Sequence, residues 1–440
     1  MKLRTKGIKP YGIIDPDFST PIWQASLPPE AVVPLLQHQG AEASAMVRIG
    51  DEVREGLLIG KAAEKGGAGV HSPIPGVVQG IIEISLPDGQ KCQAVSVKLK
   101  GQFDYLGKQK EEGDWKSLSP LGIIDLVSEK GLVHMDSFTE PLGGTLRELR
   151  KHGAGSIVIN GAAGAPFIAS EVRLANEYPE QIVKGIQVLA RVLSTDDIHF
   201  AYPRRHGRLM RPLREAAARN GLNLRFRPLR DSYSSGDPYE LIHMVTGREL
   251  LPQSGYASSG AGVFAVSTVF ALYEAVLLRK ALVDRLITIG GGAMGPTRTV
   301  RVRIGTSIGT LFSEIGGLAR TPAKILVGNP LQGFEVADAD TPVTKQIAAI
   351  IALTRDELGD APEQPCINCG ICVESCPANL EPVTLHKLLR NRRFEDARDA
   401  GLEACRVCGI CSHVCPSRIP LTASIRDGIV ALGEGAFRNE

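Results

Sequence analysis

The sequence predicts a multidomain α/β protein that ends in a helical, cysteine-rich domain. Short apolar runs separated by Gly and Pro between residues 32 and 99 are typical of a small β-sandwich. Between residues 123 and 282, helix-like and strand-like segments alternate, which favours a layered α/β domain with a mostly parallel sheet. After residue 355 the chain carries two closely similar cysteine runs.

Composition sets the broad class. The 440 residues are enough for two to four domains, and 43% hydrophobic with 22% charged residues is ordinary for a globular protein. A net charge of +2 gives no signal for nucleic acid or for an anionic membrane. Eight of the nine cysteines lie in the two runs, which fits a reducing cytoplasm, and the isolated Cys92 is expected to be a buried small side chain.

The first hundred residues predict an arm and a small β domain. Residues 1–28 are Pro-rich without a clear period and are expected to form an extended arm packed on another part of the chain. The stretches 50–60 and 71–78 resemble the barrel-sandwich fold of biotinyl and lipoyl domains. Those domains carry a modified Lys in a Met-Lys turn, which this stretch lacks, so a structural domain is expected over 29–103.

The middle of the chain predicts a Rossmann-like α/β domain over 118–282. Residues 156–160 and 197–201 are expected to be buried strands, and 179–192 an amphipathic helix. The apolar stretch 261–278 contains Ser267, Thr268 and Glu274, so it is expected to be a buried or half-buried helix rather than a membrane span.

A smaller α+β unit is expected over 283–336. Residues 286–289, 300–304 and 323–327 predict strands, and 307–315 predicts a helix.

The two cysteine runs, residues 366–377 and 405–416, have the spacing C-x2-C-x2-C-x3-C-P. This spacing binds iron–sulfur clusters in bacterial-type ferredoxins, where the fourth Cys of each run ligates the other cluster. Zinc sites usually show two separated C-x2-C pairs, and disulfides require an oxidising compartment, so neither alternative is favoured. The predicted ligands are Cys366, Cys369, Cys372 and Cys415 for cluster 1, and Cys405, Cys408, Cys411 and Cys376 for cluster 2.

Several local motifs resemble the C subunit of Rnf-type ion-translocating electron transport complexes along nearly the whole chain. They are residues 34–40, 70–73, 241–249, 303–306 and 340–345. Cobalamin reductases of propanediol metabolism share these parts but begin with the α/β domain. The resemblance implies a barrel-sandwich domain, a Rossmann-like domain, a small β-grasp (SLBB-like) unit over 283–336 and a two-[4Fe–4S] ferredoxin-like domain over 355–425.

In that family the α/β domain resembles the flavin- and NADH-binding subunit of respiratory complex I, and here its signatures are degenerate. The family loop "GIVGLGGAGFPT" corresponds to residues 131–142, "NGAECEP" to 160–166 and "NVxT" to 265–268. Acidic or bulky side chains oppose a phosphate and fill the space of a flavin ring. Ordinary FMN and NADH binding is therefore predicted to be lost. The loop positions that are glycine in the family are His134, Asp136, Ser137 and Thr139 here.

Three further features give weaker signals. The run Gly290–Gly295 follows a strand, but a phosphate site there is not favoured, because glycine-rich turns are common. Nine arginines between Arg204 and Arg230 are expected to form a solvated face, with a docking patch for an acidic redox partner as the alternative. His413, inside the second run, is expected to influence the electrostatics of its cluster.

Three hypotheses for function follow. The first is an iron–sulfur subunit that relays single electrons between a redox partner protein (ferredoxin, flavoprotein or reductase) and other subunits of an electron-transfer complex, without oxidising NADH. The second is an NADH:acceptor oxidoreductase with a remodelled FMN site, and the third is a scaffold that serves a dedicated reductase. No nucleic-acid partner and no membrane span are expected. The expected location is the cytoplasm, or the inner face of the cell membrane through partner subunits.

Overall fold

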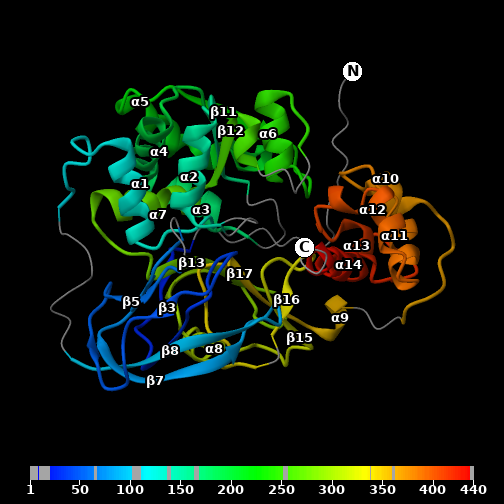
Figure 1. Ribbon diagram of the computed structural model, residues 1–440, viewed down its shortest axis with the longest axis horizontal. Coiled ribbons are helices and arrows are strands. Elements are labelled where there is room, and N and C mark those ends of the chain that lie inside the picture. Colours follow the sequence, from blue (N-terminus) through cyan, green and yellow to red (C-terminus); the bar gives the residue numbers. More distant parts are fainter. Residues whose placement is uncertain are drawn as a thin grey trace.

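The computed structural model describes residue 8 and residues 20–63, 67–101, 111–135, 140–162, 168–250, 256–336, 338–358 and 362–436. These ranges form a broad body with a smaller helical domain beside it (Figure 1). Within the body, the helices of the α/β domain lie at the top of the view and the β-rich units lie below them. Among the described residues, no helix has the length and apolar character that crossing a bilayer requires.

The β domain near the N-terminus consists of two small antiparallel sheets, ordered β2-β8-β7-β4 and β3-β5-β6. A Cβ on Gly76 would lie 2.1 Å from the Lys98 carbonyl oxygen, so only glycine allows these strands to pair this closely. Cys92 lies in this domain and is 3% exposed, as expected from its isolation in the sequence. The strands are β2 (Glu30–Pro34), β3 (Ser44–Ala45), β4 (Glu52–Val53), β5 (Leu58–Lys61), β6 (Val70–His71), β7 (Gly76–Ser85) and β8 (Lys91–Leu99).

The α/β domain has a four-stranded parallel sheet ordered β11-β10-β9-β12. Its strands are β9 (Ser156–Asn160), β10 (Ile198–Pro203), β11 (Leu224–Leu229) and β12 (Ala261–Ala265). Ser119 and Asp237 begin two of the helices, because their side chains accept hydrogen bonds from main-chain N–H groups of the first turn. The helices are α1 (Pro120–Glu129), α2 (Leu142–Lys151), α3 (Ser170–Glu177), α4 (Pro179–Leu193), α5 (Arg211–Arg219), α6 (Pro238–Thr246) and α7 (Val266–Leu277).

The prediction of one helix over residues 261–278 was wrong in its first part. Strand β12 occupies Ala261–Ala265, and α7 starts directly afterwards at Val266. Every residue of both elements is buried, so the apolar run carries no periodicity that separates strand from helix.

The third unit is built on a six-stranded mixed sheet ordered β1-β14-β13-β17-β15-β16. The N-terminal arm contributes its edge strand β1, and β17, which the sequence placed outside this unit, lies between β13 and β15. Ser307 caps helix α8 (Ile308–Glu314) of this unit. The strands are β1 (Trp23–Gln24), β13 (Asp284–Gly290), β14 (Arg298–Arg303), β15 (Lys324–Val327), β16 (Phe334–Glu335) and β17 (Ala349–Leu353).

The C-terminal domain is helical and has its own small core, which includes Leu385, Leu389, Ala397, Leu402 and Ile425. The short helix α9 (Arg355–Leu358) precedes it. Its helices are α10 (Ile371–Ser375), α11 (Pro382–Arg390), α12 (Phe394–Asp399), α13 (Ile410–His413) and α14 (Leu421–Ala436).

A network of buried charges joins α7, the mixed sheet and the β domain. The Asp284 carboxylate lies 2.6 Å from Lys280, 3.0 Å from Arg301 and 3.2 Å from Arg303. Arg303 also contacts Glu55 at 3.0 Å, and the Glu55 side chain is 2% exposed. Such a network is sensitive to the loss of one member, because the partners then remain buried without compensation.

Lys345 connects three units of the body. Its Nζ donates hydrogen bonds to the carbonyl oxygens of Gly69 at 2.8 Å and Gly131 at 2.7 Å. Gly131 has φ +70° and approaches Gly69 so closely that a Cβ would lie 2.2 Å from its carbonyl oxygen. Lys345 is 1% exposed, and burial lowers its pKa to about 7.

This burial predicts a pH-dependent stability. In the unfolded chain a Lys has a pKa near 10.4. Between pH 7 and pH 9 the unfolded chain therefore binds more protons at Lys345 than the folded chain does. The free energy of unfolding is expected to rise by about 2 kcal/mol over this range. In Lys345→Met this contribution is expected to disappear. Urea titrations at pH 7 and pH 9 check this, with the exposed Lys91→Met as control. A native-like pH response in Lys345→Met would assign the effect to another group.

Candidate metal centres

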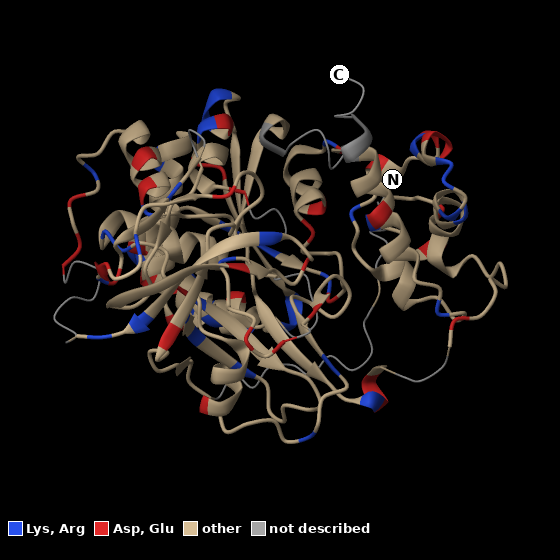
Figure 2. Ribbon diagram, turned by 60° about the horizontal axis from the view of Figure 1, so that its bottom comes forward, with Lys and Arg blue, Asp and Glu red and all other residues tan. Residues whose placement is uncertain are grey.

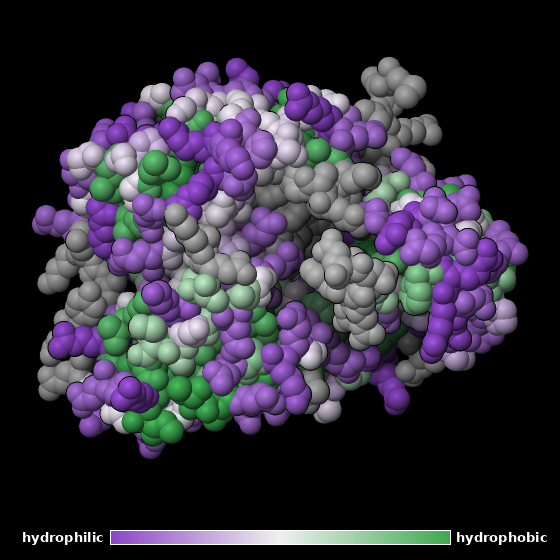
Figure 3. Space-filling view, viewed as in Figure 1, coloured by the Kyte–Doolittle hydropathy of each residue, from purple (hydrophilic) through white to green (hydrophobic). Residues whose placement is uncertain are grey.

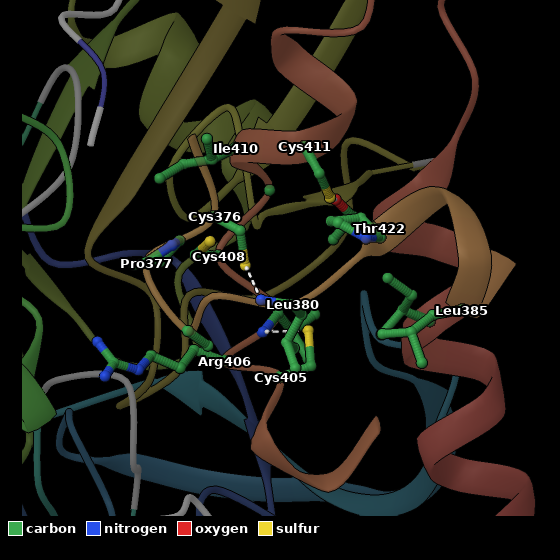
Figure 4. Close-up of a pocket in the computed structure, with 15 residues that line it drawn as sticks. Cys376, Pro377, Leu380, Leu385, Cys405, Arg406, Cys408, Ile410, Cys411 and Thr422 are labelled. Atoms are coloured by element: carbon green, nitrogen blue, oxygen red, sulfur yellow. Dashed lines mark hydrogen bonds between the residues drawn. The ribbon is translucent and has the colours of Figure 1, made fainter. Parts of the chain in front are cut away.

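The structure gathers the eight motif cysteines at two cavities. Cys366, Cys369, Cys372 and Cys415 line one of them. The second is lined by Cys376, Cys405, Cys408 and Cys411, whose side chains surround it in Figure 4. In each cavity, three cysteines come from one run and one comes from the other, the grouping that the sequence predicts.

The two cysteine loops have the same backbone conformation. Each has a non-glycine residue with positive φ two positions after its first Cys, namely Asn368 at 54° and Val407 at 49°. Each places a glycine one position after its second Cys, with φ of 76° at Gly370 and 82° at Gly409. The turns aim main-chain N–H groups at sulfur, since Asn368 N lies 3.4 Å from Cys366 Sγ and Val407 N lies 3.4 Å from Cys405 Sγ.

The second cavity suits a soft, positively charged metal group. Burial raises the pKa of Cys405 and of Cys408 to about 12 and also raises that of Cys411. Without a compensating cation these thiols stay neutral, whereas iron deprotonates its thiol ligands. Two polar groups also reach the sulfurs, because Leu380 N lies 3.3 Å from Cys376 Sγ and Thr422 Oγ1 lies 3.4 Å from Cys411 Sγ. A bound cluster there would accept and release single electrons.

The second loop is attached to the body through side chains of other units. The Tyr233 hydroxyl donates to the Cys408 carbonyl oxygen at 2.7 Å, and Gln332 Nε2 donates to the Val407 carbonyl oxygen at 3.3 Å. Arg406 contacts Asp237 at 3.3 Å and Glu240 at 2.7 Å. The sequence predicted none of these partners, since the loop is more than 70 residues from each of them in the chain.

A larger cavity of about 750 Å³ lies between the second loop and the α/β domain. Figure 3 shows the hollow between the body and the helical domain. Cys408 contributes to its wall together with Asn160, Glu171, Ala265 and Tyr233. The cavity therefore connects the carboxyl ends of β9 and β12 with one of the motif cysteines.

The N-terminus of α7, beside this cavity, is occupied by the chain's own carboxylate. Glu171 is 5% exposed, and its Oε2 accepts a hydrogen bond from Ser267 N at 2.8 Å. Burial raises the pKa of Glu171. A phosphate commonly binds at such a helix N-terminus, so Glu171 takes the place that the phosphate would need. Thr268 is also engaged, since its Oγ1 accepts from Met135 N at 3.0 Å.

The degenerate flavin loop is described only in part. His134 is fully buried, and its ring stacks on Phe264 with centroids 5.5 Å apart. This ring fills space in which the family loop has a glycine. Asp136, Ser137 and Thr139, and residues 163–166 of the second signature, lie outside the described residues. Where side chains are described, they do not fit an FMN phosphate at α7.

Residues of the glycine run and of the arginine segment form hydrogen bonds and ion pairs within the fold. In the run Gly290–Gly295, Gly292 N donates to both carboxylate oxygens of Glu357, at 3.0 and 2.9 Å. Several arginines of the 204–230 segment have intramolecular partners, as in Arg211–Glu215 at 2.8 Å and Arg219–Glu180 at 2.6 Å. This agrees with the expectation of a solvated face. His413 is exposed at the end of α13.

Three parts of the chain match known protein families. Residues 4–102 match the RnfC barrel sandwich hybrid domain family, residues 127–274 the Nuo51 FMN-binding domain family and residues 365–419 the 4Fe-4S dicluster domain family. The third match confirms the predicted iron–sulfur domain.

Two curated relatives are similar over most of their length. The C component of the proton-translocating ferredoxin:NAD(+) oxidoreductase complex of Clostridium ljungdahlii is 30% identical over 86% of this chain and 82% of that protein. The C component of the ion-translocating oxidoreductase complex of Rhodobacter capsulatus is 31% identical over 90% of this chain and 76% of that protein.

Among solved structures, an NAD+-reducing [NiFe]-hydrogenase has a similar fold. The TM-score is 0.51 at 14% identity, over 72% of this chain and 62% of that chain, so this chain corresponds to less than two thirds of its length.

Proposed function

The chain belongs to the family of C subunits of ion-translocating oxidoreductase complexes, and on that premise we propose that it relays single electrons through two [4Fe–4S] clusters. The observation that carries the proposal is the grouping of four cysteines at each of two cavities. We assign Cys366, Cys369, Cys372 and Cys415 to cluster 1, and Cys405, Cys408, Cys411 and Cys376 to cluster 2.

Electrons would pass between a redox partner protein and the other subunits of the complex. The partner would be a ferredoxin, a flavoprotein or a reductase, and the chain would lie peripherally on the inner face of the membrane through its partners. We also assign the small mixed sheet with its helix α8, which residues 283–336 form together with β1 and β17, as a β-grasp, SLBB-like unit. Gln332 of this unit donates to the loop of cluster 2.

We propose further that the chain does not oxidise NADH. Glu171 at the N-terminus of α7 supports this proposal, because its carboxyl group already accepts the hydrogen bond of Ser267 N and takes the place that the phosphate of FMN would need. The buried ring of His134 supports the proposal as well. It stacks on Phe264 of β12 and so fills space beside the strand that leads into α7.

One observation favours the second candidate, an NADH:acceptor oxidoreductase with a remodelled flavin site. The cavity of about 750 Å³ is large enough for a cofactor, and Cys408 lies in its wall. A flavin bound there would be next to cluster 2. The two candidates therefore differ in whether this cavity binds FMN.

Anaerobic purification separates the candidates. We expect about eight irons and about eight acid-labile sulfides per chain. We also expect no extractable flavin, even after incubation with excess FMN followed by desalting, and no bleaching of the visible spectrum by NADH. Stoichiometric FMN together with bleaching by NADH would establish the second candidate instead.

A further inference from the structure

The two cysteine loops are structural repeats, so their surroundings can be compared position by position. Ile367 corresponds to Arg406, Cys369 to Cys408, Gly370 to Gly409 and Ile371 to Ile410, each pair at the same place in its run. The φ values of Gly370 and Gly409 differ by only a few degrees, at 76° and 82°. Any difference in exposure therefore comes from what packs on each loop.

The loop of cluster 2 is covered by the body of the protein. The main chain of Leu331 lies directly on Gly409, where a Cβ would be 2.0 Å from the Leu331 carbonyl oxygen. Ile410 is fully buried, and the side chain of Arg406 is only 14% exposed because it pairs with Asp237 and Glu240.

The loop of cluster 1 has the same shape without such a cover among the described residues. No atom of another described residue lies within 4 Å of the Cβ position of Gly370, its chain neighbours aside. Ile367 is 66% exposed and Ile371 is 41% exposed, although both are large apolar side chains. Cys369 is exposed, whereas its counterpart Cys408 is not. In Figure 1, α10 lies at the top of the helical domain.

We propose that the outer face formed by Ile367, Asn368, Cys369, Gly370 and Ile371 is the docking surface for a one-electron redox protein. The partner would place its main chain on Gly370 as the Leu331 segment lies on Gly409, and would cover the two isoleucines. This inference rests on the proposed relay function. One electron passes from the reduced partner to cluster 1, so the partner is oxidised by one electron and the cluster is reduced by one, and no covalent bond forms or breaks.

The size of the outer face favours a transient electron carrier over a permanent subunit or a second copy. Two exposed isoleucines and three small or polar residues make a minor apolar surface, as in weak redox encounters. Figure 2 marks charged residues on several segments of the ribbon of the helical domain, and such residues would give the encounter a polar rim. A few apolar side chains at the centre of an interface usually provide most of its affinity.

Stopped-flow reduction of the full chain with its clusters tests this surface. The donors are a reduced bacterial two-[4Fe–4S] ferredoxin and reduced methyl viologen, a small donor that needs no docking surface. The test variant carries Ile367→Gln and Ile371→Gln. The matched control is Val430→Gln, which changes an apolar side chain, 55% exposed, on α14 of the same domain.

The double variant is expected to be reduced by ferredoxin at least tenfold more slowly, with the rate for methyl viologen unchanged within about twofold. Val430→Gln should match the native chain with both donors. Equal ferredoxin rates in all three proteins would overturn the docking surface. So would a tenfold loss with both donors, or a native chain that methyl viologen reduces and ferredoxin does not.

Sedimentation of the same proteins gives a further test. A native dimer that the double variant dissociates would identify the outer face as a contact between two copies and would overturn the proposal. Failure of the relay function itself looks different, because the native chain would then contain no clusters or would not be reduced by methyl viologen.

Discussion

Replacing Cys408 with serine is expected to remove cluster 2 and lower the iron content from about eight to about four per chain. Cys408 lies in the cavity with Cys376, Cys405 and Cys411, and a serine hydroxyl is a poor ligand for iron in place of a thiolate. Iron analysis and the low-temperature EPR spectrum of the reduced protein would measure the loss. The signal that remains should be that of cluster 1.

Cys369→Ser is the matched variant for cluster 1, and Cys92→Ser is the control. Cys369→Ser should leave the signal of cluster 2, whereas Cys92 lies in β8, away from both cavities, and its replacement should preserve all the iron. Survival of both signals in Cys408→Ser would disprove the ligand assignment. Loss of iron in Cys92→Ser would show that the measurement reports general unfolding.

Replacing Asp284 with asparagine is expected to lower the free energy of unfolding by about 3–5 kcal/mol. Burial alone would raise the pKa of Asp284, but Arg301, Lys280 and Arg303 together hold that pKa well below its usual range. Asparagine has nearly the same volume but no charge, so the cations next to it would remain buried with less compensation. Denaturant titration at pH 7 would measure the change.

The surface pair Arg147–Asp125 provides the control for this experiment. Its contact is 2.8 Å long, but the Asp125 side chain is 71% exposed, so Asp125→Asn should change stability by less than about 1 kcal/mol. The contribution of Asp284 should be constant above its unfolded pKa near 3.9 and should be lost as pH falls below it. Equal effects of the two substitutions would mean that the buried network contributes no more than a surface pair.

The sequence predicted the parts of the structure that depend on local patterns. The cysteine spacing predicted which residues would share a cavity, since the crossing of the fourth Cys is a property of the motif itself. The strand Ser156–Asn160 was predicted, and the helix predicted over 179–192 is α4 (Pro179–Leu193), because their apolar residues follow the periods of a buried strand and an amphipathic helix.

Features that depend on distant partners could not be predicted. β17 lies at the centre of a sheet whose other strands come from earlier in the chain, and β1 joins the same sheet from the N-terminal arm. Tyr233 lacks any local signal for its hydrogen bond to Cys408, which is 175 residues away. The position of Glu171 at α7 likewise depends on a contact across 96 residues.

No described residue packs on the Cβ position of Gly370, and this should also influence how the protein breaks down. Cys369 is exposed whereas Cys408 is partly buried, so oxygen and chelators should reach cluster 1 first and oxidative loss of iron should begin there. Cluster 2 would then remain alone. A sample kept in air would still show a visible spectrum although cluster 1, the cluster at the docking surface, had been lost. An iron content of about four per chain would in that case reflect the handling of the sample rather than the native protein.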